Sequence, residues 1–296
     1  MSIEKIRLKK IPVYTIHTIS CKTTNVGLLE ILPFEEHLKN AEHIQFPHRH
    51  DFYYLLYITS GKGTHTIDFK NYPVKNNQLF FMSPAQVHEW DLPLNTKGYT
   101  LFFTKELFSS KDFKIENEWS FFHNFFDDAA FVVPKAEQKT IELFFSSILK
   151  EYQSTQFNKD KITKSLTEAL LYKIDELLQL KKNTNNENNS DTIRRFDLLI
   201  DKNFIEQHQL DFYADRLNIS PNYLNALCKK NLGKTAKELL SERLLLEAKR
   251  LIKHSNLSVN EIADYLNFNS SSYFVRFFSK HEQITPFQFK TKKIEK

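Results

Sequence analysis

The sequence is poor in cysteine: Cys21 and Cys228 are the only two in 296 residues. Two cysteines so far apart provide neither a disulfide framework nor a Cys-rich zinc site, and we expect both to be small buried apolar residues. No apolar run approaches the roughly 18–20 residues that cross a bilayer, and the first twelve residues are charged, without the apolar core of a secretion signal. We therefore expect a cytoplasmic protein with no membrane partner.

The chain is long and rich in apolar residues. At roughly 100–200 residues per domain its length predicts two domains, and a content of 41% hydrophobic residues, with 27 Phe and 12 Tyr, excludes wholesale disorder. The formal net charge of +5 lies in the last third, where residues 192–296 contain 18 Lys and Arg against 12 Asp and Glu. This asymmetry modestly favours a polyanionic partner such as nucleic acid.

The N-terminal part of the sequence has the pattern of β-strands. From about residue 11 to 133, short runs rich in Phe, Tyr, Ile and Thr alternate with Gly, Pro and Asn, as in FYYLLYITSGKGTHTIDF, NNQLFFMSP and GYTLFFT. These runs predict a sandwich or barrel. Two amphipathic helices are predicted next, with apolar stripes over residues 141–152 and 162–178. The stripes either cover the barrel or pair in part with a second subunit, and the second alternative makes a homodimer an expected assembly.

A polar segment separates this region from the rest of the chain. Residues 181–190 (KKNTNNENNS) are half Asn and contain no apolar residue, which is typical of a solvated linker. We therefore expect an N-terminal domain over residues 1–180, a linker over 181–191 and a helical C-terminal domain over 192–296.

The C-terminal region contains an internal repeat. The sequence ADRLN at residues 214–218 returns as ADYLN at 263–267, and Tyr223, Lys230 and Thr235 return 50 residues later as Tyr273, Lys280 and Thr285. Two copies of one supersecondary unit explain these matches. We place the copies at about 209–233 and 258–283.

Each copy has the start and stop signals of two short helices. Ser220 and Pro221 provide an N-cap and a first helical residue, and Gly233 ends that helix. Ser258 and Glu261 fit a capping box. Such a helix pair is a helix-turn-helix, although a helical bundle that binds no nucleic acid would share the pattern.

A single long helix is predicted between the two copies. Residues 237–253 (KELLSERLLLEAKRLIK) are strong helix formers that would extend about 25 Å. Such a rigid spacer could hold two recognition helices at successive major grooves, about 34 Å apart.

Residues from about 197 to 290 resemble the paired helix-turn-helix domain of the AraC family of bacterial transcription regulators. The segments ADRLNISPNYLNALCKKNLGKT and SVNEIADYLNFNSSSYFVRFFSKHEQITPFQF carry this resemblance. In two places the sequence departs from the family, because Asn267 and Gln283 stand where the family usually has Gly. Asn still adopts the left-handed conformation, whereas Gln does so poorly, which weakens the assignment of a turn there.

The resemblance also implies which residues contact DNA. Asn pairs with adenine, Arg with guanine, and an apolar side chain touches the thymine methyl group. Arg276 is the strongest candidate for base reading; its alternative role is an ion pair with Asp264. The expected base-contacting residues are Asn222, Asn225, Ala226, Ser271, Ser272, Val275 and Arg276, and the expected phosphate-contacting residues are Lys229, Lys230, Lys280 and His281.

The segments PHRHDFYYLLYITSGKGTHTIDF and NNQLFFMSPAQVHEW resemble the cupin-type sensor barrel that precedes such DNA-binding domains. Cupin enzymes hold a metal with three His and one Glu, and Tyr54 stands in the place of that Glu. A site of three imidazoles without a carboxylate could still hold zinc, but nothing in the sequence orients it, so we expect no metal, no cofactor and no catalytic residue. Singly, the histidines are expected to be hydrogen-bonded strand residues. As a group, the candidates for an effector pocket are His48, His50, Tyr54, His88 and Trp90.

The expected fold class is α+β in two domains: an N-terminal cupin-like β-barrel with flanking amphipathic helices and a C-terminal all-α double helix-turn-helix. The expected function is sequence-specific transcription regulation under the control of a small-molecule effector. The alternative is a metal-dependent cupin enzyme with a fused helical domain. Double-stranded DNA and a second copy of the chain are the expected partners, and an effector and RNA polymerase are further candidates.

Overall fold

The computed structural model of the protein describes residues 11–19, 27–40, 47–108, 119–122, 129–182 and 187–292. The chain divides into two compact units, and the boundary between them lies at residues 185 and 186. Among the described residues, no helix is both long and apolar enough for a bilayer crossing. Cys228 is buried, as expected, and Cys21 lies outside the described residues.

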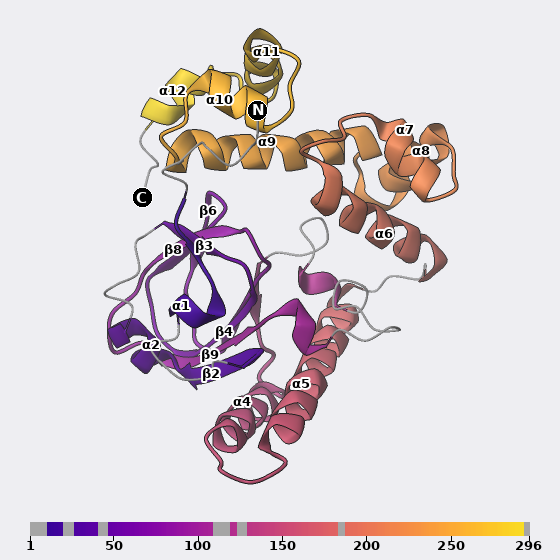
Figure 1. Cartoon of the computed structure of the whole chain (residues 1–296). Coiled ribbons are helices and arrows are strands. Elements are labelled where there is room, and N and C mark those ends of the chain that lie inside the picture. Colours follow the sequence, from indigo (N-terminus) through magenta and orange to yellow (C-terminus); the bar gives the residue numbers. More distant parts are fainter. Residues whose placement is uncertain are drawn as a thin grey trace. The chain divides into compact units, whose positions relative to one another are not determined.

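The N-terminal unit is built from two five-stranded sheets (Figure 1), in the orders β1-β3-β8-β5-β6 and β10-β7-β4-β9-β2. The expected β-barrel fold is confirmed. Two short helices, α1 (Ile16–Ile19) and α2 (Phe34–Asn40), had not been predicted. The strands are β1 (Val13–Tyr14), β2 (Leu29–Pro33), β3 (His48–His50), β4 (Tyr53–Ser60), β5 (Thr64–Ile67), β6 (Lys70–Pro73), β7 (Gln78–Met82), β8 (Val87–Asp91), β9 (Lys97–Phe103) and β10 (Ala130–Val132).

Strand β4 is buried on both faces, which explains its nearly continuous apolar sequence. Successive side chains of a strand point to opposite faces. Tyr54 and Leu56 belong to a core that also contains Ile67 of the opposite sheet. Leu55 and Tyr57 belong to a second core, on the side covered by two helices. The barrel therefore has an interior of its own, separate from the layer beneath the helices.

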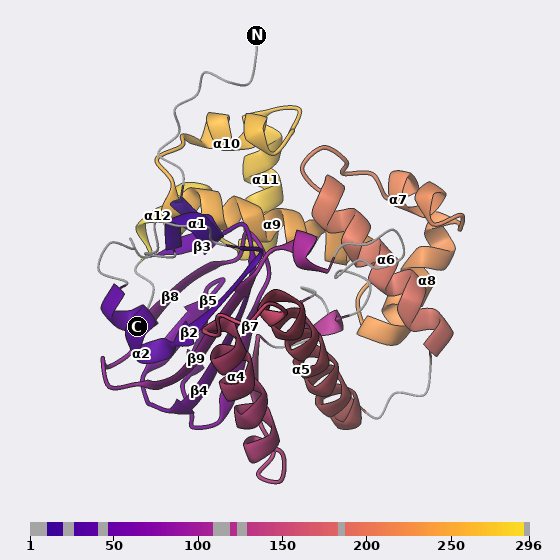
Figure 2. The same ribbon diagram turned by 60° about the horizontal axis from the view of Figure 1, so that its bottom comes forward.

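Helices α4 (Gln138–Tyr152) and α5 (Lys159–Lys182) lie side by side against the second sheet, as Figure 2 shows. The side chains of Ile141, Phe145 and Ile174 are fully buried in the core that they share with this sheet. The ring of Phe145 stacks on that of Tyr57, with 5.2 Å between the centroids. The structure thus shows that these helices cover the barrel, and the pairing of part of the stripes with a second subunit stays a prediction.

The C-terminal unit is entirely helical, and α9 (Ala236–His254) runs through it as its central element (Figure 1). The prediction of one uninterrupted helix is confirmed: α9 has 19 residues, a length of about 28 Å at 1.5 Å per residue. Helices of both copies contact α9. The other helices are α6 (Glu187–Asn203), α7 (Leu210–Arg216), α8 (Pro221–Leu232), α10 (Val259–Tyr265), α11 (Ser271–Glu282) and α12 (Pro286–Thr291).

The segment expected to be a solvated linker is helical at both ends. Helix α5 continues to Lys182 and α6 begins at Glu187, so only the residues between them lie outside the described helices. Asn costs only about 0.7 kcal/mol relative to Ala in a helix. The burial of Ile193 and Phe196 on α6 outweighs that cost. The boundary between the two compact units lies inside the predicted linker over 181–191, and that linker stays a prediction, although part of it is helical.

Candidate functional site

The second helix of each copy begins and ends in the same way. Ser220 caps α8 by accepting a hydrogen bond from the Tyr223 backbone N–H at 3.2 Å, and Ser270 caps α11 by accepting one from Tyr273 at 3.2 Å. Helix α11 thus starts at Ser271. The predicted caps at Ser220 and Ser258 are confirmed.

The two helices also end in the left-handed conformation, with φ of 74° at Gly233 and 60° at Gln283. The doubt about the turn at Gln283 was therefore wrong. Its side-chain amide donates a hydrogen bond to the carbonyl of Lys280 at 2.8 Å, which fixes the residue locally. Asn267, the other departure from glycine, is left-handed as well, with φ of 55°.

Helix α8 presents only part of its expected DNA-contacting set to solvent. Asn222 and Ala226 are exposed, opposite the buried Leu224 and Leu227. Asn225 is half-buried instead. Its amide oxygen accepts a hydrogen bond at 3.3 Å from the backbone N–H of Lys237, at the start of α9, so this side chain joins α8 to the spacer helix.

Helix α11 has a clearer division into two faces. Ser272, Arg276 and Lys280 are exposed and lie on one side, because residues four apart share a helix face. Phe274 and Phe278 are fully buried on the other side. Ser271 and Val275, at the edges, are half-buried.

Arg276 and Asp264 do not form the ion pair that was the alternative role for this arginine: no salt bridge joins them within residues 187–292. The expected phosphate-contacting residues Lys229, Lys230, Lys280 and His281 are exposed and lie in the last turns of α8 and α11. There they also stabilise the negative end of each helix dipole.

Two exposed tyrosines were missed by the sequence analysis. Tyr223 and Tyr273 are 53% and 50% exposed, at equivalent positions of α8 and α11. The repeat had identified the pair as a match between the two copies, without assigning it a role. Their neighbours Leu224 and Phe274 fill that role, and the 3.6-residue period then places the tyrosines toward solvent.

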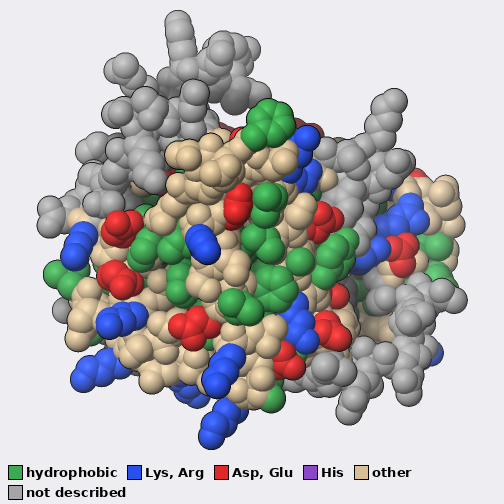
Figure 3. Space-filling model, turned by 90° about the horizontal axis from the view of Figure 1, so that it is seen from below, with side chains coloured by type: hydrophobic (Ala, Val, Ile, Leu, Met, Phe, Trp, Pro, Cys, Tyr) green, Lys and Arg blue, Asp and Glu red, His purple; other side chains and the backbone are tan. Residues whose placement is uncertain are grey.

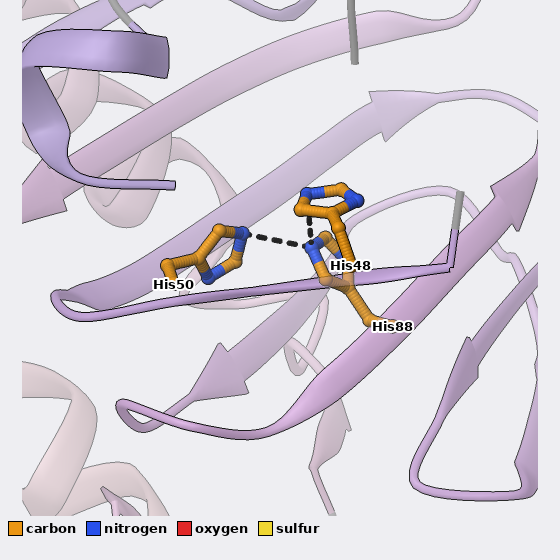
Figure 4. A group of neighbouring side chains, drawn as sticks. All are labelled: His48, His50 and His88. Carbon is orange, nitrogen blue, oxygen red and sulfur yellow. Dashed lines mark hydrogen bonds between the residues drawn. The ribbon is translucent and has the colours of Figure 1, made fainter. Parts of the chain in front are cut away.

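The histidines of the barrel converge in its interior. His48 on β3 is paired in register with His88 on β8, and the two-residue period of a strand places His50 on the same face as His48. The Nε2 atom of His88 lies 3.0 Å from that of His48 and 2.8 Å from that of His50 (Figure 4). All three side chains are buried.

The remaining candidates for an effector pocket surround these rings. Tyr54, from the opposite sheet, has its ring centroid 5.4 Å from that of His50, and Trp90 lies 5.2 Å from His88. The structure thus brings together all five residues expected there. It adds His65 on β5, whose Nε2 lies 3.0 Å from Nδ1 of His88.

His65 and His37 were not singled out from the sequence. His65 lies two residues before the buried Ile67 on β5 and so shares its inward face, and this two-residue spacing was a usable signal. His37 lies on α2, a helix that the sequence analysis did not predict, with its ring 5.5 Å from that of Trp90.

The buried imidazoles are neutral at physiological pH. Burial lowers the pKa of His48 to about 3, with the charge of His37 adding to the effect. Burial likewise lowers the pKa of His65 to about 3 and holds the pKa of both His50 and His88 well below its ordinary value, with repulsion among the histidines adding. Each ring therefore has one N–H group and one free lone pair.

Comparison with known proteins shows to which class of protein this two-unit chain belongs. Residues 213–292 match a family profile described as a helix-turn-helix domain, and residues 31–103 match one described as an AraC-like ligand binding domain. The HTH-type transcriptional activator RhaS of Escherichia coli is 22% identical over 262 residues, which cover 81% of this chain and 86% of RhaS. The chain is a DNA-binding regulator with an N-terminal ligand-binding domain. It belongs to the AraC family of transcription regulators.

Solved structures also match the chain. ToxT from Vibrio cholerae is 13% identical over 81% of this chain and 88% of its own, with a TM-score of 0.41. The C-terminal domain of the response regulator yesN from Fusobacterium nucleatum is 30% identical over 32% of this chain and 93% of its own, with a TM-score of 0.31.

Proposed function

We propose that the chain regulates transcription by placing α8 and α11 in successive major grooves of double-stranded DNA. The observation that carries this proposal is the outer face of α11, where a hydroxyl, a guanidinium and an ammonium group (Ser272, Arg276 and Lys280) line up opposite a phenylalanine core. Hydroxyl and guanidinium groups read base edges, and an ammonium group binds phosphate. The length of α9, about 28 Å, approaches the spacing of one DNA turn.

We assign different weights to the proposed contact residues. Asn222 and Ala226 on α8 and Ser272 and Arg276 on α11 are exposed and are the proposed base readers. Asn225 must give up its hydrogen bond to α9 before it can bind a base, so it ranks below them. Lysines and histidine at the ends of both helices are the proposed phosphate contacts.

The experiment is selection of DNA from a randomised duplex library by the full chain and by a fragment spanning residues 187–296. Both should enrich one motif with two half-sites about one helical turn apart. The logarithm of affinity should fall with that of salt concentration by about 0.9 per neutralised phosphate. A fragment that is folded by circular dichroism but shows no binding, or binding insensitive to salt, would contradict the proposal.

A homodimer formed through α4 and α5 is the second part of the proposal. Apolar side chains remain exposed on this helix pair: Leu143 on α4 and Ile162 and Tyr172 on α5 are 66%, 41% and 44% exposed. Figure 3 shows hydrophobic side chains gathered near the centre of the face seen from below, the side on which α4 and α5 lie in Figure 1.

Ultracentrifugation of the full chain at tens of micromolar tests the dimer. Leu143→Glu should shift the protein to a monomer. Leu94→Glu is the matched control, because Leu94 is equally exposed (67%) but lies in the loop between β8 and β9. A wild-type protein that is strictly monomeric at this concentration, far above usual dimer affinities, would contradict a dimer.

The barrel is proposed to bind a small-molecule effector among its histidines and to have no catalytic activity. Because the relative RhaS is an activator, we propose that this chain also activates transcription, in the cytoplasm, through contact with RNA polymerase. Expression of a reporter placed behind the selected DNA motif should rise when the chain is present. A fall in expression would indicate repression instead.

A further inference from the structure

Three imidazoles in the barrel direct the same atom toward one point. His48, His50 and His88 each offer one ligand nitrogen, and these nitrogens all lie within 4.8 Å of one another. Figure 4 shows the three rings directed toward one another. We propose that these three atoms bind one divalent transition metal ion inside the barrel. Neither the DNA-binding proposal nor the ligand-binding assignment of the barrel includes a metal.

The hydrogen-bond balance of His88 favours this interpretation. A neutral imidazole has a single N–H group, and Nε2 of His88 faces the Nε2 atoms of both His48 and His50. Its Nδ1 faces Nε2 of His65 at 3.0 Å. If Nδ1 of His88 carries the proton and donates it to His65, Nε2 keeps its lone pair. Metal-binding histidines typically donate their second ring N–H to a neighbouring acceptor in this way.

The positions of the rings require little change to hold an ion. Zinc binds imidazole nitrogen at about 2.0–2.1 Å in a tetrahedron, so two ligand nitrogens lie about 3.4 Å apart. The Nε2 atoms of His48 and His50 now lie 3.0 and 2.8 Å from that of His88. An opening of about half an ångström brings these two distances to the value required, and the three ligand nitrogens already lie within 4.8 Å of one another. The hydrogen-bonded pairing of β3 with β8 holds the backbone in place.

The ligand set selects the kind of ion. Imidazole nitrogens suit zinc, copper, nickel and iron, whereas magnesium and calcium require oxygen ligands. Three protein ligands leave a fourth position for water or a small anion.

The ligand set lacks the carboxylate that cupin enzymes have, and this absence has a different consequence for a sensor than for an enzyme. Tyr54 supplies no negative charge near the histidines, and burial keeps its hydroxyl neutral by raising its pKa. An ion held by three neutral imidazoles keeps its double positive charge in a buried site, which favours an anion as the fourth ligand. The site is therefore suited to retain an ion together with an anionic ligand, without need of a catalytic base.

Cobalt titration of the full chain tests the inference after the protein has been stripped with a chelator. The wild type should bind one Co²⁺ per chain, with the intense visible absorption of a tetrahedral complex, and Zn²⁺ should displace it. His50→Gln and His88→Gln should each weaken binding more than about 100-fold, because each removes a ligand. His37→Gln is the matched control: His37 is equally buried in the barrel but contributes no atom to the cluster, so affinity should change less than threefold.

His65 is a positioning residue, and its role is separable from a merely structural one. His65→Leu should weaken cobalt binding about 10–100-fold by removing the acceptor for the Nδ1 proton of His88. His65→Gln, whose amide oxygen accepts that proton, should restore most of the affinity. If the two variants have equal thermal stability but different affinities for cobalt, the orientation of His88 is responsible for the loss of cobalt binding.

Two results would overturn the inference: no binding of Co²⁺ or Zn²⁺ by the stripped wild type at 100 micromolar, or unchanged binding in both His50→Gln and His88→Gln. If these variants do not fold, X-ray absorption of the zinc-loaded wild type decides the question, because three imidazoles must appear around the metal. A coordination shell without imidazole would refute the site, and the cluster would then be a hydrogen-bonded core. Failure here leaves DNA binding untouched, since none of these measurements involves DNA.

Discussion

The two helix-turn-helix copies share a backbone but differ in what they present to solvent. Asn218 and Asn267 both adopt φ of 55° between the two helices of their copy. Thr235 and Thr285, the last matched pair of the repeat, both form capping boxes at the start of the following helix. Residues that satisfy backbone groups are thus the ones that the two copies have in common.

The differences lie on the outer faces. Ala226 on α8 corresponds to Arg276 on α11, and Asn225, which is hydrogen-bonded to α9, corresponds to the half-buried Val275. The first copy is therefore tied to the spacer and offers a methyl group, whereas the second offers a guanidinium group. The residues that hold the backbone and the residues that are proposed to contact DNA occupy different positions. Substitutions should therefore be able to change stability or DNA recognition separately.

Glu247 should give the largest effect, because its buried carboxylate pairs with two arginines of α9, the helix that helices of both copies contact. Its carboxylate lies 3.0 Å from Nη1 of Arg250 and 3.7 Å from Nη1 of Arg243, and Arg243 also donates a hydrogen bond to Asp201 of α6 at 2.8 Å. Glu247→Gln should lower the free energy of unfolding of the C-terminal unit by about 3–5 kcal/mol, since it removes the negative charge that lies between two buried guanidinium groups.

Urea denaturation of a fragment spanning residues 187–296 measures this change. Glu242→Gln is the control on the same helix: its ion pair with Lys234 is exposed, with 2.7 Å between the charged atoms, and should contribute less than about 1 kcal/mol. Equal effects of the two substitutions would show that the buried cluster does not couple the copies.

Arg276→Ala should give the next largest effect, on recognition alone. Loss of a bidentate contact to guanine should cost about 1–3 kcal/mol of binding free energy and relax the preference at one base pair. Lys280→Ala is the matched control on the same face of α11; it should weaken all sequences alike and reduce the salt slope by about 1. Selection from a randomised library measures both. An unchanged motif with Arg276→Ala would contradict base reading at this position.

Local features were the part of the structure that the sequence could predict. The caps at Ser220 and Ser258 and the end of α8 at Gly233 depend on hydrogen bonds within a few residues. The residue types at these positions therefore predict where the helices begin and end. Gln283 shows the limit of that logic, because a side-chain bond to Lys280 holds a conformation that the residue disfavours.

Features that depend on tertiary contacts escaped prediction. The approach of His65 to His88 requires the pairing of β5 with β8, which no local pattern encodes. Similarly, whether the helices cover the barrel depended on whether Phe145 meets the sheet. The gathering of His48, His50 and His88 was predicted from the sequence, whereas the participation of His65 was not.

The capping boxes at Thr235 and Thr285 allow a smaller and more selective comparison. Thr235→Ala and Thr285→Ala should each cost about 1 kcal/mol of stability near neutral pH, since each removes the acceptor for a backbone N–H at 3.2 Å. The first box is closed by a carboxylate, Glu238, and the second by an amide, Gln288.

Only the first box should respond to acid. The hydrogen bonds from Thr235 lower the pKa of Glu238 below its usual value of 4.5. Its contribution is therefore present above pH 4.5 and is lost as the pH falls through the lowered pKa. Denaturation of both variants at neutral and acidic pH should show a pH-dependent penalty for Thr235→Ala and a constant one for Thr285→Ala. A parallel response would mean that the charge of Glu238 is immaterial to the cap.

Gln283→Gly should have the smallest effect, and its sign is the informative part. A left-handed conformation costs a residue with a Cβ roughly 1 kcal/mol more than glycine. The substitution removes that cost but also removes the exposed hydrogen bond to Lys280 and gives the unfolded chain more freedom. We expect a net gain in stability of about 0.5 kcal/mol.

The reciprocal change in the first copy should act in the opposite direction. Gly233→Ala places a Cβ where no atom lies within 4 Å, so only the positive φ of 74° opposes it, and a loss of about 1 kcal/mol is expected. Gln283→Ala, which keeps the Cβ but loses the amide, should be less stable than both wild type and Gln283→Gly. Thermal unfolding of the fragment spanning residues 187–296 ranks the variants. A destabilised Gln283→Gly would mean that the bond to Lys280, rather than the backbone conformation, decides how the second copy ends its recognition helix.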